Sequence, residues 1–265
     1  MSHKSGRYAS ELTNRQWKYL AALLPNRSGQ VGRPMELGLR EVMNAIFYLV
    51  RTGCQWKNLP REYPNYKSVY YHYRKWCLDG TWERINRALV YLERKRQGRL
   101  PHPSAALIDS QSSKTTESGG ERSYDGGKKI SGRKRHIMTD TLGNLLLVVV
   151  HAAGIADCEG AKLVFQSLPP MWHTRLQVVW ADGGYEGALW VWVYTLFHIV
   201  VAIVKRSADQ SGFVVLPKRW IVERTFGWFG RYRRLSKDYE LTIQSSESMI
   251  YISMINLMLH RLAPE

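Results

Sequence analysis

Three acidic residues stand where a folded α/β chain tends to carry its chemistry. Asp109 ends the apolar run of residues 105–109 (AALID), and Asp182 ends a second run at residues 176–182 (LQVVWAD). An acid in this position lies where a buried strand emerges at a sheet edge, and open α/β sheets place their sites at such edges. Glu223 differs, because it lies in a helical pattern rich in arginine and aromatic residues (IVERTFGWFGRYRRL).

Three carboxylates on two strand ends and one helix suit a divalent metal ion. Mg²⁺ takes hard oxygen ligands and binds few protein carboxylates together with water and substrate phosphate. Two such ions about 4 Å apart can activate an attacking oxygen and stabilise the leaving oxygen of an in-line displacement at phosphorus. Six histidines lack the HxxxH-type spacing of metal ligands, and we interpret them as surface or core residues: His72, His102, His136, His151, His173 and His198.

Each acid also has a purely structural interpretation. An aspartate at a strand end is commonly a turn residue or a helix N-cap. Glu223 could simply pair with Arg219 on an exposed helix, a contact worth about 0.3–0.5 kcal/mol. Asp140 also follows a β-type run and could join a metal site, although a turn acid is the simpler interpretation. Asp125 and Glu121 lie in a glycine-rich stretch and are assigned no role.

The composition indicates a folded, strongly basic protein. The chain has 265 residues, of which 45% are hydrophobic and 23% charged, and its formal net charge is +16. A core is therefore expected rather than bulk disorder, and the positive charge favours nucleic acid as the partner. The cysteines form no CxxC pair, which argues against a disulfide framework and a cysteine-based zinc site: Cys54, Cys77 and Cys158.

We expect a cytoplasmic, nucleoid-associated protein with no membrane partner. The first ten residues (MSHKSGRYAS) lack the apolar core of a signal peptide. The most apolar stretch, residues 188–204, contains His198 and is shorter than the ~20 residues of a membrane helix. It is better interpreted as a buried helix running into a buried strand.

The pattern changes near residue 100, so we predict an all-α domain at residues 1–100 and a mixed α/β domain at residues 101–265. Helices are expected at residues 11–24, 36–52, 69–78 and 82–96, with candidate N-caps at Thr13 or Asn14, Ser68 and Thr81. The second part predicts a strand at 105–109, a hairpin of 136–140 with 145–154, a helix at 158–168, a strand at 176–182, a helix from about 185, a strand at 198–204 and a basic helix at about 218–232.

Several sequence blocks resemble the bacterial insertion-sequence DDE transposases of family five, which is related to family four. The family's catalytic blocks are similar to ALIDSQSSKTTE, GRKRHIMTD, VVWADGGYEG and RWIVERTFGWFGRYRRLSKDYE, and its N-terminal helical region is similar to LTNRQWKYLAALLP, GRPMELGLREVMNAIFYLVRTGCQWKNLP and YYHYRKWCLDGTWERIN. Long blocks in the family's order are far more specific than a short motif. The resemblance implies an RNase H-like mixed-sheet catalytic domain preceded by a small all-α domain.

The resemblance also implies a catalytic triad of Asp109 (in LIDSQ), Asp182 (in ADGGY) and Glu223 (in RWIVERTF). These residues would bind two ions of Mg²⁺ or Mn²⁺ per active site, with both aspartates on both ions and the glutamate on at least one.

A related motif, Tyr-x2-Arg-x3-Glu-x6-Lys, is only partly kept. Arg219 and Glu223 match it, whereas Leu216 and Gly230 stand at its Tyr and Lys positions. Arg231, one residue later, is a candidate substitute for the lysine.

Basic clusters are candidates for phosphate contacts, which supply most of the affinity of a DNA-binding protein and make it salt-dependent. Each residue could instead belong to a solvated surface. The candidates precede the hairpin, surround the Glu223 helix and lie on the third N-terminal helix: Lys128, Lys129, Arg133, Lys134, Arg135; Arg219, Arg224, Arg231, Arg233, Arg234, Lys237; Lys67, Arg74, Lys75. Trp228 could stack on an unpaired base, although packing with Phe226 and Phe229 is the simpler interpretation.

The implied activity is DNA transposition by metal-dependent phosphoryl transfer. Water would free a 3′-OH at the end of the element, and that 3′-OH would attack target DNA. The implied partners are double-stranded DNA, as terminal inverted repeats and target, and a second copy of the chain in a homodimer on DNA. Two alternatives stay open: an RNase H-like nuclease without strand transfer, and a non-catalytic DNA-binding repressor derived from a transposase.

Overall fold

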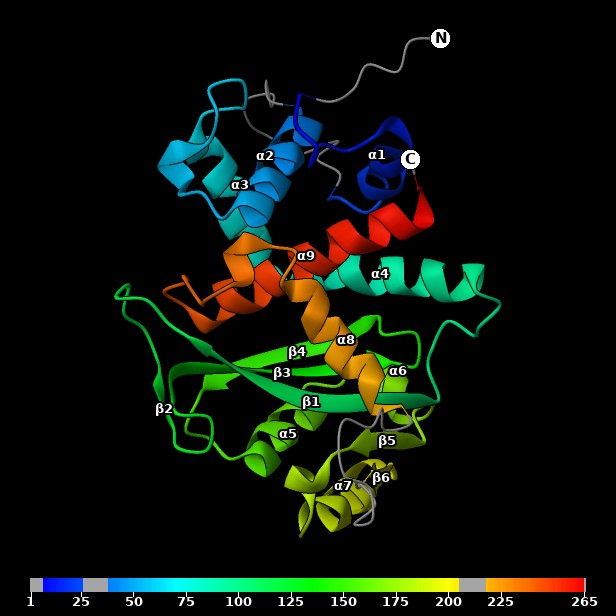
Figure 1. The fold of residues 1–265 in the computed structure, drawn as a ribbon. Coiled ribbons are helices and arrows are strands. Elements are labelled where there is room, and N and C mark those ends of the chain that lie inside the picture. The colour runs from blue at the N-terminus through cyan, green and yellow to red at the C-terminus, as the bar shows by residue number, and fades with distance from the viewer. Residues whose placement is uncertain (1–6, 26–37, 205–217, 265) are drawn as a thin grey trace.

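The computed structural model describes residues 7–25, 38–204 and 218–264. The first part of the chain is helical, as predicted, and Figure 1 shows its helices gathered above the sheet. They are α1 (Asn14–Ala21), α2 (Leu39–Thr52), α3 (Tyr66–Leu78) and α4 (Thr81–Arg96), with a short 3₁₀ turn at Trp56–Asn58. No described helix combines the length and the apolar character needed to cross a bilayer.

Two of the predicted N-caps are replaced by residues that lie earlier in the chain. Thr13 caps α1 in a capping box with Gln16, as the pattern predicted. Ser68 instead lies inside α3, because the side chain of Asn65 accepts the bond from the N–H of Lys67 one turn earlier. Thr81 is the first residue of α4, whose N-cap is Gly80. The predicted start of the second helix at residue 36 lies outside the described residues.

The second part forms one mixed six-stranded sheet, which agrees with the predicted class. Its central strand β1 (Ala105–Lys114) pairs antiparallel with β3 (Ile130–Asp140) on one side and parallel with β5 (Val178–Ala181) on the other. The sheet continues antiparallel to β4 (Leu145–Ala152) beyond β3, and parallel to β6 (Val200–Ile203) beyond β5. The short β2 (Ser123–Asp125) pairs with the start of β3.

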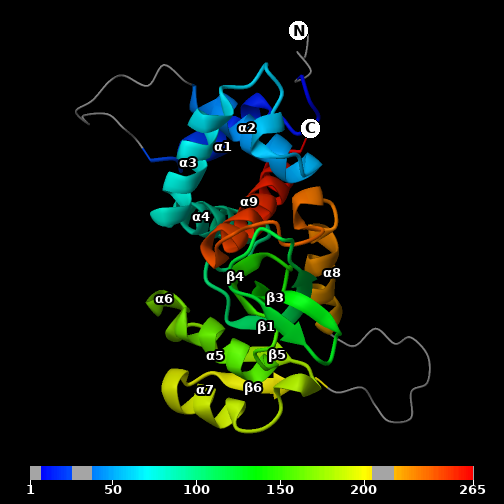
Figure 2. The same cartoon turned by 90° about the vertical axis from the view of Figure 1, so that its left-hand side faces the viewer.

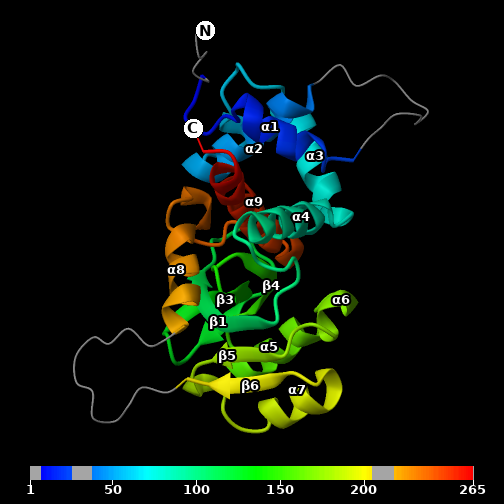
Figure 3. The same cartoon turned by 90° about the vertical axis from the view of Figure 1, so that its right-hand side faces the viewer.

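Helices cover both faces of the sheet. α5 (Asp157–Gln166) packs on β3 and β4, whereas α8 (Arg219–Phe229) packs on β1 and β3. Figures 2 and 3 show α8 along one side of the strands and α5 on another, with α7 (Leu189–Phe197) and β6 far from α1 and α2. Gly160 lets α5 approach closely, because any side chain there would collide with the rings of His136 and His151. A short helix, α6 (Pro170–His173), follows α5.

The largely buried helix α9 (Ile243–Leu262) is absent from the sequence-based prediction, which ended at residue 232. It contacts all four N-terminal helices and β4. The side chains of Tyr251 and Glu247 accept bonds from the N–H groups of Val148 and Val150 on β4. α9 thereby covers the outer edge of β4 and shares one hydrophobic cluster with both parts of the chain. The domain boundary near residue 100 stays a prediction.

Candidate active site

Asp109 and Asp182 lie side by side at the centre of the sheet. The parallel register pairs Ala105 with Val178 and Leu107 with Trp180. Continued by two residues, the same register sets Asp109 level with Asp182, on strands whose spacing is about 4.8 Å. The side chain of Asp182 accepts the N–H of Gly184 at 2.9 Å and so begins the 3₁₀ turn Gly183–Tyr185.

Glu223 lies on α8, and Arg219 links its carboxylate to that of Asp182. The guanidinium Nη2 of Arg219 lies 3.2 Å from Oε1 of Glu223 and 3.7 Å from Oδ2 of Asp182. The predicted pairing of Glu223 with the residue four positions before it is therefore present, and the same arginine also joins the helix to the strand end. Glu223 is half exposed and Asp182 is partly buried, so both carboxylates remain open to solvent.

The alternation of side chains along β1 determines the face of the sheet to which the Asp109 side chain points. Directly opposed residues of an antiparallel pair share a face, and Asp109 opposes Ile137 while Ser110 opposes His136. Ser110 bonds to Asp157 of α5, so its side chain faces that helix. Asp109 therefore points to the opposite face, where α8 packs and where the positive charge of Arg219 favours its ionised form.

The electrostatics of Asp109 are those of a buried carboxylate whose nearby cations only partly offset its burial. Burial raises the pKa of Asp109 to about 6, and the charge of Asp182 adds to this rise. The N–H of Ser110, which bonds to Asp109 Oδ1 at 2.7 Å, and the cations Arg219 and Lys128 oppose it. Two acids on adjacent strands thus repel each other, a repulsion that a bound cation would relieve.

Asp109→Asn should stabilise the metal-free protein at neutral pH. Since the folded chain holds a proton on Asp109 up to about pH 6 and the unfolded chain releases it near 3.8, wild-type stability falls as the pH rises between these values. Asparagine cannot ionise and escapes this loss, on the order of 1–3 kcal/mol above pH 7. Urea unfolding in EDTA at pH 4 and pH 8 measures the difference. A variant that is equally destabilised at both pH values would contradict the assigned pKa.

The donor set fits a divalent ion by its chemistry. All three groups are carboxylates, the hard oxygen donors that Mg²⁺ and Mn²⁺ prefer. Among the described residues, no three His, Cys, Asp or Glu side chains stand close enough together to hold one ion in this conformation. Arg219 lies between Asp182 and Glu223 here and supplies positive charge at that position.

The basic run of residues 133–135 lies inside the protein. β3 alternates these side chains across the sheet, and both faces are covered, so Arg133, Lys134 and Arg135 are 0%, 5% and 2% exposed. Arg135 donates to the carbonyl oxygens of Leu235 and Lys237. Arg234 is also buried, against Glu240. These four side chains have no surface on which to meet a phosphate, and the DNA contacts proposed below omit them.

The other predicted DNA contacts reach the surface. Lys128 lies next to the carboxylates and donates to the carbonyl oxygen of Ser110 at 3.2 Å. Arg224 is half-buried, bonds to the Leu142 carbonyl and stacks on Trp228, which also lies under Arg261. The exposed members of the set are Lys67, Lys128, Lys129, Arg231, Arg233 and Lys237, and the partly buried members are Arg74, Lys75, Arg219 and Arg224.

α3 carries a surface in which cations and aromatic rings alternate. Side chains of α3 and of its C-cap, Asp79, line an open hollow: Lys67, Tyr70, Tyr71, Arg74, Lys75, Leu78 and Asp79. Tyr70, Tyr71 and Leu78 are 44%, 57% and 61% exposed, and one guanidinium nitrogen of Arg74 is buried without a hydrogen-bond partner. Exposed rings between cations are typical of surfaces that bind nucleic acid.

Two structural interpretations made from the sequence are confirmed. Asp140 is a turn acid, because its carboxylate accepts the N–H groups of Leu142 and Asn144 and binds the buried Arg94 at 2.6 Å. His136 and His151 are core residues.

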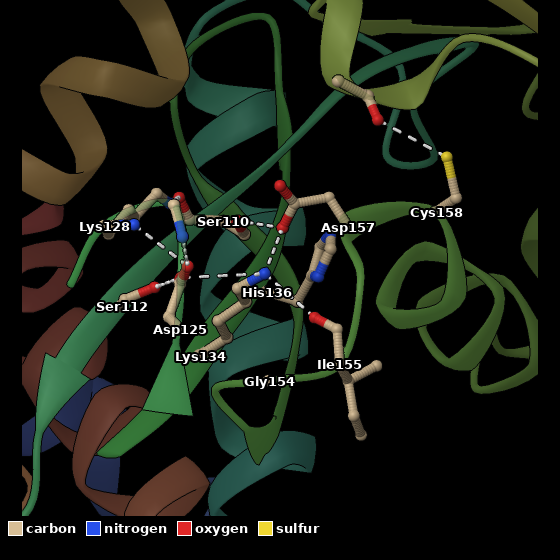
Figure 4. A network of polar contacts seen from close by, with 12 residues as sticks. Ser110, Ser112, Asp125, Lys128, Lys134, His136, Gly154, Ile155, Asp157 and Cys158 are labelled. Carbon is tan, nitrogen blue, oxygen red and sulfur yellow. Dashed lines mark hydrogen bonds and ion pairs between the residues drawn. The ribbon is translucent and has the colours of Figure 1, made fainter. Parts of the chain in front are cut away.

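The sequence analysis missed Asp157 and gave Asp125 no role. Both are joined by Lys134 in a network of polar contacts behind β1, shown in Figure 4. Asp157 could have been noticed as an acid at the start of a helix, but that position is ordinary.

Comparison with known protein families gives two matches that together cover most of the chain. Residues 100–259 match the family described as "Transposase DDE domain", and residues 12–86 match "Putative transposase of IS4/5 family". A curated protein of Burkholderia cepacia, "Putative transposase for insertion sequence element IS402", is 32% identical over 115 residues, 41% of this chain and 54% of that protein. The chain thus matches about half the length of this relative. No solved structure matches significantly. With the strand order, the first match confirms the RNase H-like fold class.

Proposed function

Since the chain belongs to the DDE transposases of insertion sequences, we propose that it binds the ends of such an element, cuts the DNA there and transfers the freed end into target DNA. The observation that carries this proposal is the level placement of Asp109 and Asp182 on neighbouring parallel strands, with Glu223 joined to Asp182 through Arg219. Carboxylates carried on rigid strands and a helix are suited to bind the metal ions of phosphoryl transfer.

The carboxylates would hold two divalent ions, with Asp109 and Asp182 on both and Glu223 on at least one. When bound, such a pair of ions activates the attacking oxygen and stabilises the leaving oxygen. Lys128 and Arg219 flank the carboxylates, and we assign to them the binding and orientation of the scissile strand's phosphates.

The proposed reaction has two steps, hydrolysis at the element end and transfer of that end to the target. In the first, a water oxygen bonds to phosphorus and the bond to the 3′ oxygen breaks, which leaves a 3′-OH on the element. In the second, this 3′-OH attacks a phosphodiester of the target, and the target's own 3′ oxygen leaves. Two element ends must react together, so we propose a homodimer on DNA.

The proposal is tested by incubating the protein with a plasmid that carries the native locus and its flanking DNA, with Mg²⁺ or Mn²⁺. Discrete cuts at the element ends together with joined products are the expected result. Cuts without joined products would favour a simple nuclease. Specific binding without cleavage in either metal would favour a repressor.

Loss of the α3 cations should weaken DNA binding without a change in cleavage chemistry. A Lys67→Ala, Arg74→Ala, Lys75→Ala protein is expected to bind element-end DNA about tenfold or more weakly. Each lost phosphate contact should flatten the plot of log affinity against log salt by about 0.9. Gel shifts at several salt concentrations measure both effects.

The matched control is Lys95→Ala on α4, an exposed lysine outside the predicted contacts. It should leave the affinity and the salt slope unchanged. A triple variant with wild-type affinity and slope would remove α3 from the DNA-binding surface.

A further inference from the structure

The first turn of α5 contacts the segments that follow both predicted catalytic aspartates. Asp157 Oδ1 accepts the hydroxyl of Ser110, the residue after Asp109, at 2.8 Å. Cys158 Sγ lies 3.4 Å and 3.6 Å from the carbonyl oxygens of Gly184 and Glu186, in the turn that follows Asp182. Figure 4 shows Asp157 and Cys158 at the start of this helix, with the Asp157 carboxylate directed toward Ser110.

Ser110 transmits the first of these contacts to Asp109. Its N–H donates to Asp109 Oδ1 at 2.7 Å, and its carbonyl oxygen accepts Lys128 Nζ at 3.2 Å. With the hydroxyl bonded to Asp157, every polar group of Ser110 is engaged. A shift of Ser110 would therefore alter the position of the Asp109 carboxylate.

Lys134 holds Asp157 in place from beneath. Its ammonium group is buried and donates to Asp157 Oδ1 at 3.0 Å and to the Ile155 carbonyl oxygen at 2.9 Å. Asp125 Oδ2 lies 3.8 Å from the same nitrogen and accepts the hydroxyl of Ser112 at 2.6 Å. The buried charge is thus compensated by two carboxylates and a carbonyl group, an arrangement in which loss of one partner is costly.

The turn after Asp182 is anchored in the same layer by a chain of neutral rings. The hydroxyl oxygen of Tyr185 lies 2.8 Å from His136 Nε2, and His136 Nδ1 lies 3.3 Å from His151 Nε2. His151 Nδ1 donates to the Ala152 carbonyl oxygen, which makes its other nitrogen an acceptor from His136. Tyr185 is then the donor to His136. Burial lowers the pKa of His136 to about 3, so the ring stays neutral.

We infer that the Asp157–Lys134 pair is a positioning device, which acts through Ser110 to hold Asp109 level with Asp182 and so sets the affinity of this site for divalent ions. The inference rests on the proposed function, because the positioned groups are the proposed metal ligands. Asp157 itself is a positioning residue, since its described bonds go to Ser110 and Lys134. Residues that orient metal ligands typically change the metal affinity 10–100-fold when replaced.

The test compares Mn²⁺ binding by the full chain with its thermal stability. Asp157→Asn keeps the size and one acceptor oxygen but removes the charge that faces Lys134. Calorimetric titration with Mn²⁺ is expected to give a Kd at least about tenfold higher than that of the wild type. The matched control is Glu159→Gln in the same turn, an exposed acid that pairs with Lys162, and its Kd should not change.

Ser110→Ala separates positioning from folding. It breaks the link between Asp157 and Asp109 but leaves the ion pair with Lys134 intact. We expect Ser110→Ala to raise the Kd for Mn²⁺ as much as Asp157→Asn does, with an unchanged thermal midpoint. This variant still tests the positioning role if Asp157→Asn fails to fold. Wild-type Mn²⁺ affinity in Ser110→Ala, or in a folded Asp157→Asn, would overturn the inference.

DNA cleavage, measured in parallel, keeps the two proposals apart. If the wild type binds Mn²⁺ and cuts the element ends while both variants bind Mn²⁺ normally, the positioning role is wrong and the proposed function stands. If the variants lose Mn²⁺ affinity but the wild type never cuts, the positioning role stands and the proposed function is wrong. A wild type that binds no Mn²⁺ overturns both.

Discussion

Asp182→Asn protein should bind element-end DNA as tightly as the wild type and yet cut it at least about a thousandfold more slowly. Asparagine preserves the size of the side chain and the bond to the Gly184 N–H. It removes the negative charge that a divalent ion needs from a ligand on this strand. Glu223→Gln should behave alike, because its carboxylate faces the same space across Arg219. Single-turnover cleavage with Mn²⁺, alongside a gel shift, measures both effects.

Glu117→Gln is the control for these variants, since it replaces an exposed acid on the segment after β1. It should cut like the wild type. Wild-type cleavage by Asp182→Asn would exclude this residue from the active site. Loss of DNA binding together with cleavage would point to a folding defect, and the thermal midpoint would reveal it.

Arg133→Ala is expected to destabilise the fold by about 3–5 kcal/mol, the usual cost of removing one partner from a buried ion pair. The guanidinium is fully buried, lies 3.3 Å from Asp238 and donates to the carbonyl oxygens of Glu121, Glu240 and Leu241. Its loss leaves the buried Asp238 without this cation. Urea unfolding at neutral pH gives the free energy of unfolding.

The matched control is Lys129→Ala, an exposed cation just before β3 that should cost less than about 0.5 kcal/mol. The comparison also tests the sequence-based interpretation of the basic run. An Arg133→Ala protein with wild-type stability and weakened DNA binding would restore Arg133 as a phosphate contact.

The signals that predicted the fold correctly were local. The apolar runs before Asp109 and Asp182 located β1 and β5, and Asp182 directly follows β5 as predicted. The predicted end of β1 at Asp109 was wrong, because the strand continues to Lys114 in its pairing with β3. The hairpin of β3 and β4 follows from a turn sequence between two β-type runs. Glu223 required the family resemblance, because an acid inside a basic helix is more often a partner for its own arginines.

The features that the sequence analysis missed depend on distant contacts. Arg133, Lys134 and Arg135 look like an exposed cationic patch until it is known that helices and loops cover both faces of β3. The role of Asp157 arises from Ser110, 47 residues earlier in the chain. α9 is different, because Thr242 provides an N-cap and the middle of the helix, residues 249–259, is rich in buried Met, Ile and Leu.

The position of α9 has a consequence for how the protein folds. The side chain of Gln16, buried in α1, donates to the carbonyl oxygen of Ala263, a contact that spans 247 residues. Contacts between residues so far apart in the chain form slowly, because the chain between them loses conformational entropy before the contact can stabilise the fold. During synthesis, part of the apolar surface of α1–α4 is therefore expected to stay exposed until residues 243–262 have been made. The outer edge of β4 is expected to stay uncovered for the same time. Assembly of the helical part and of the sheet is thus expected to be a single late event, triggered by the docking of α9.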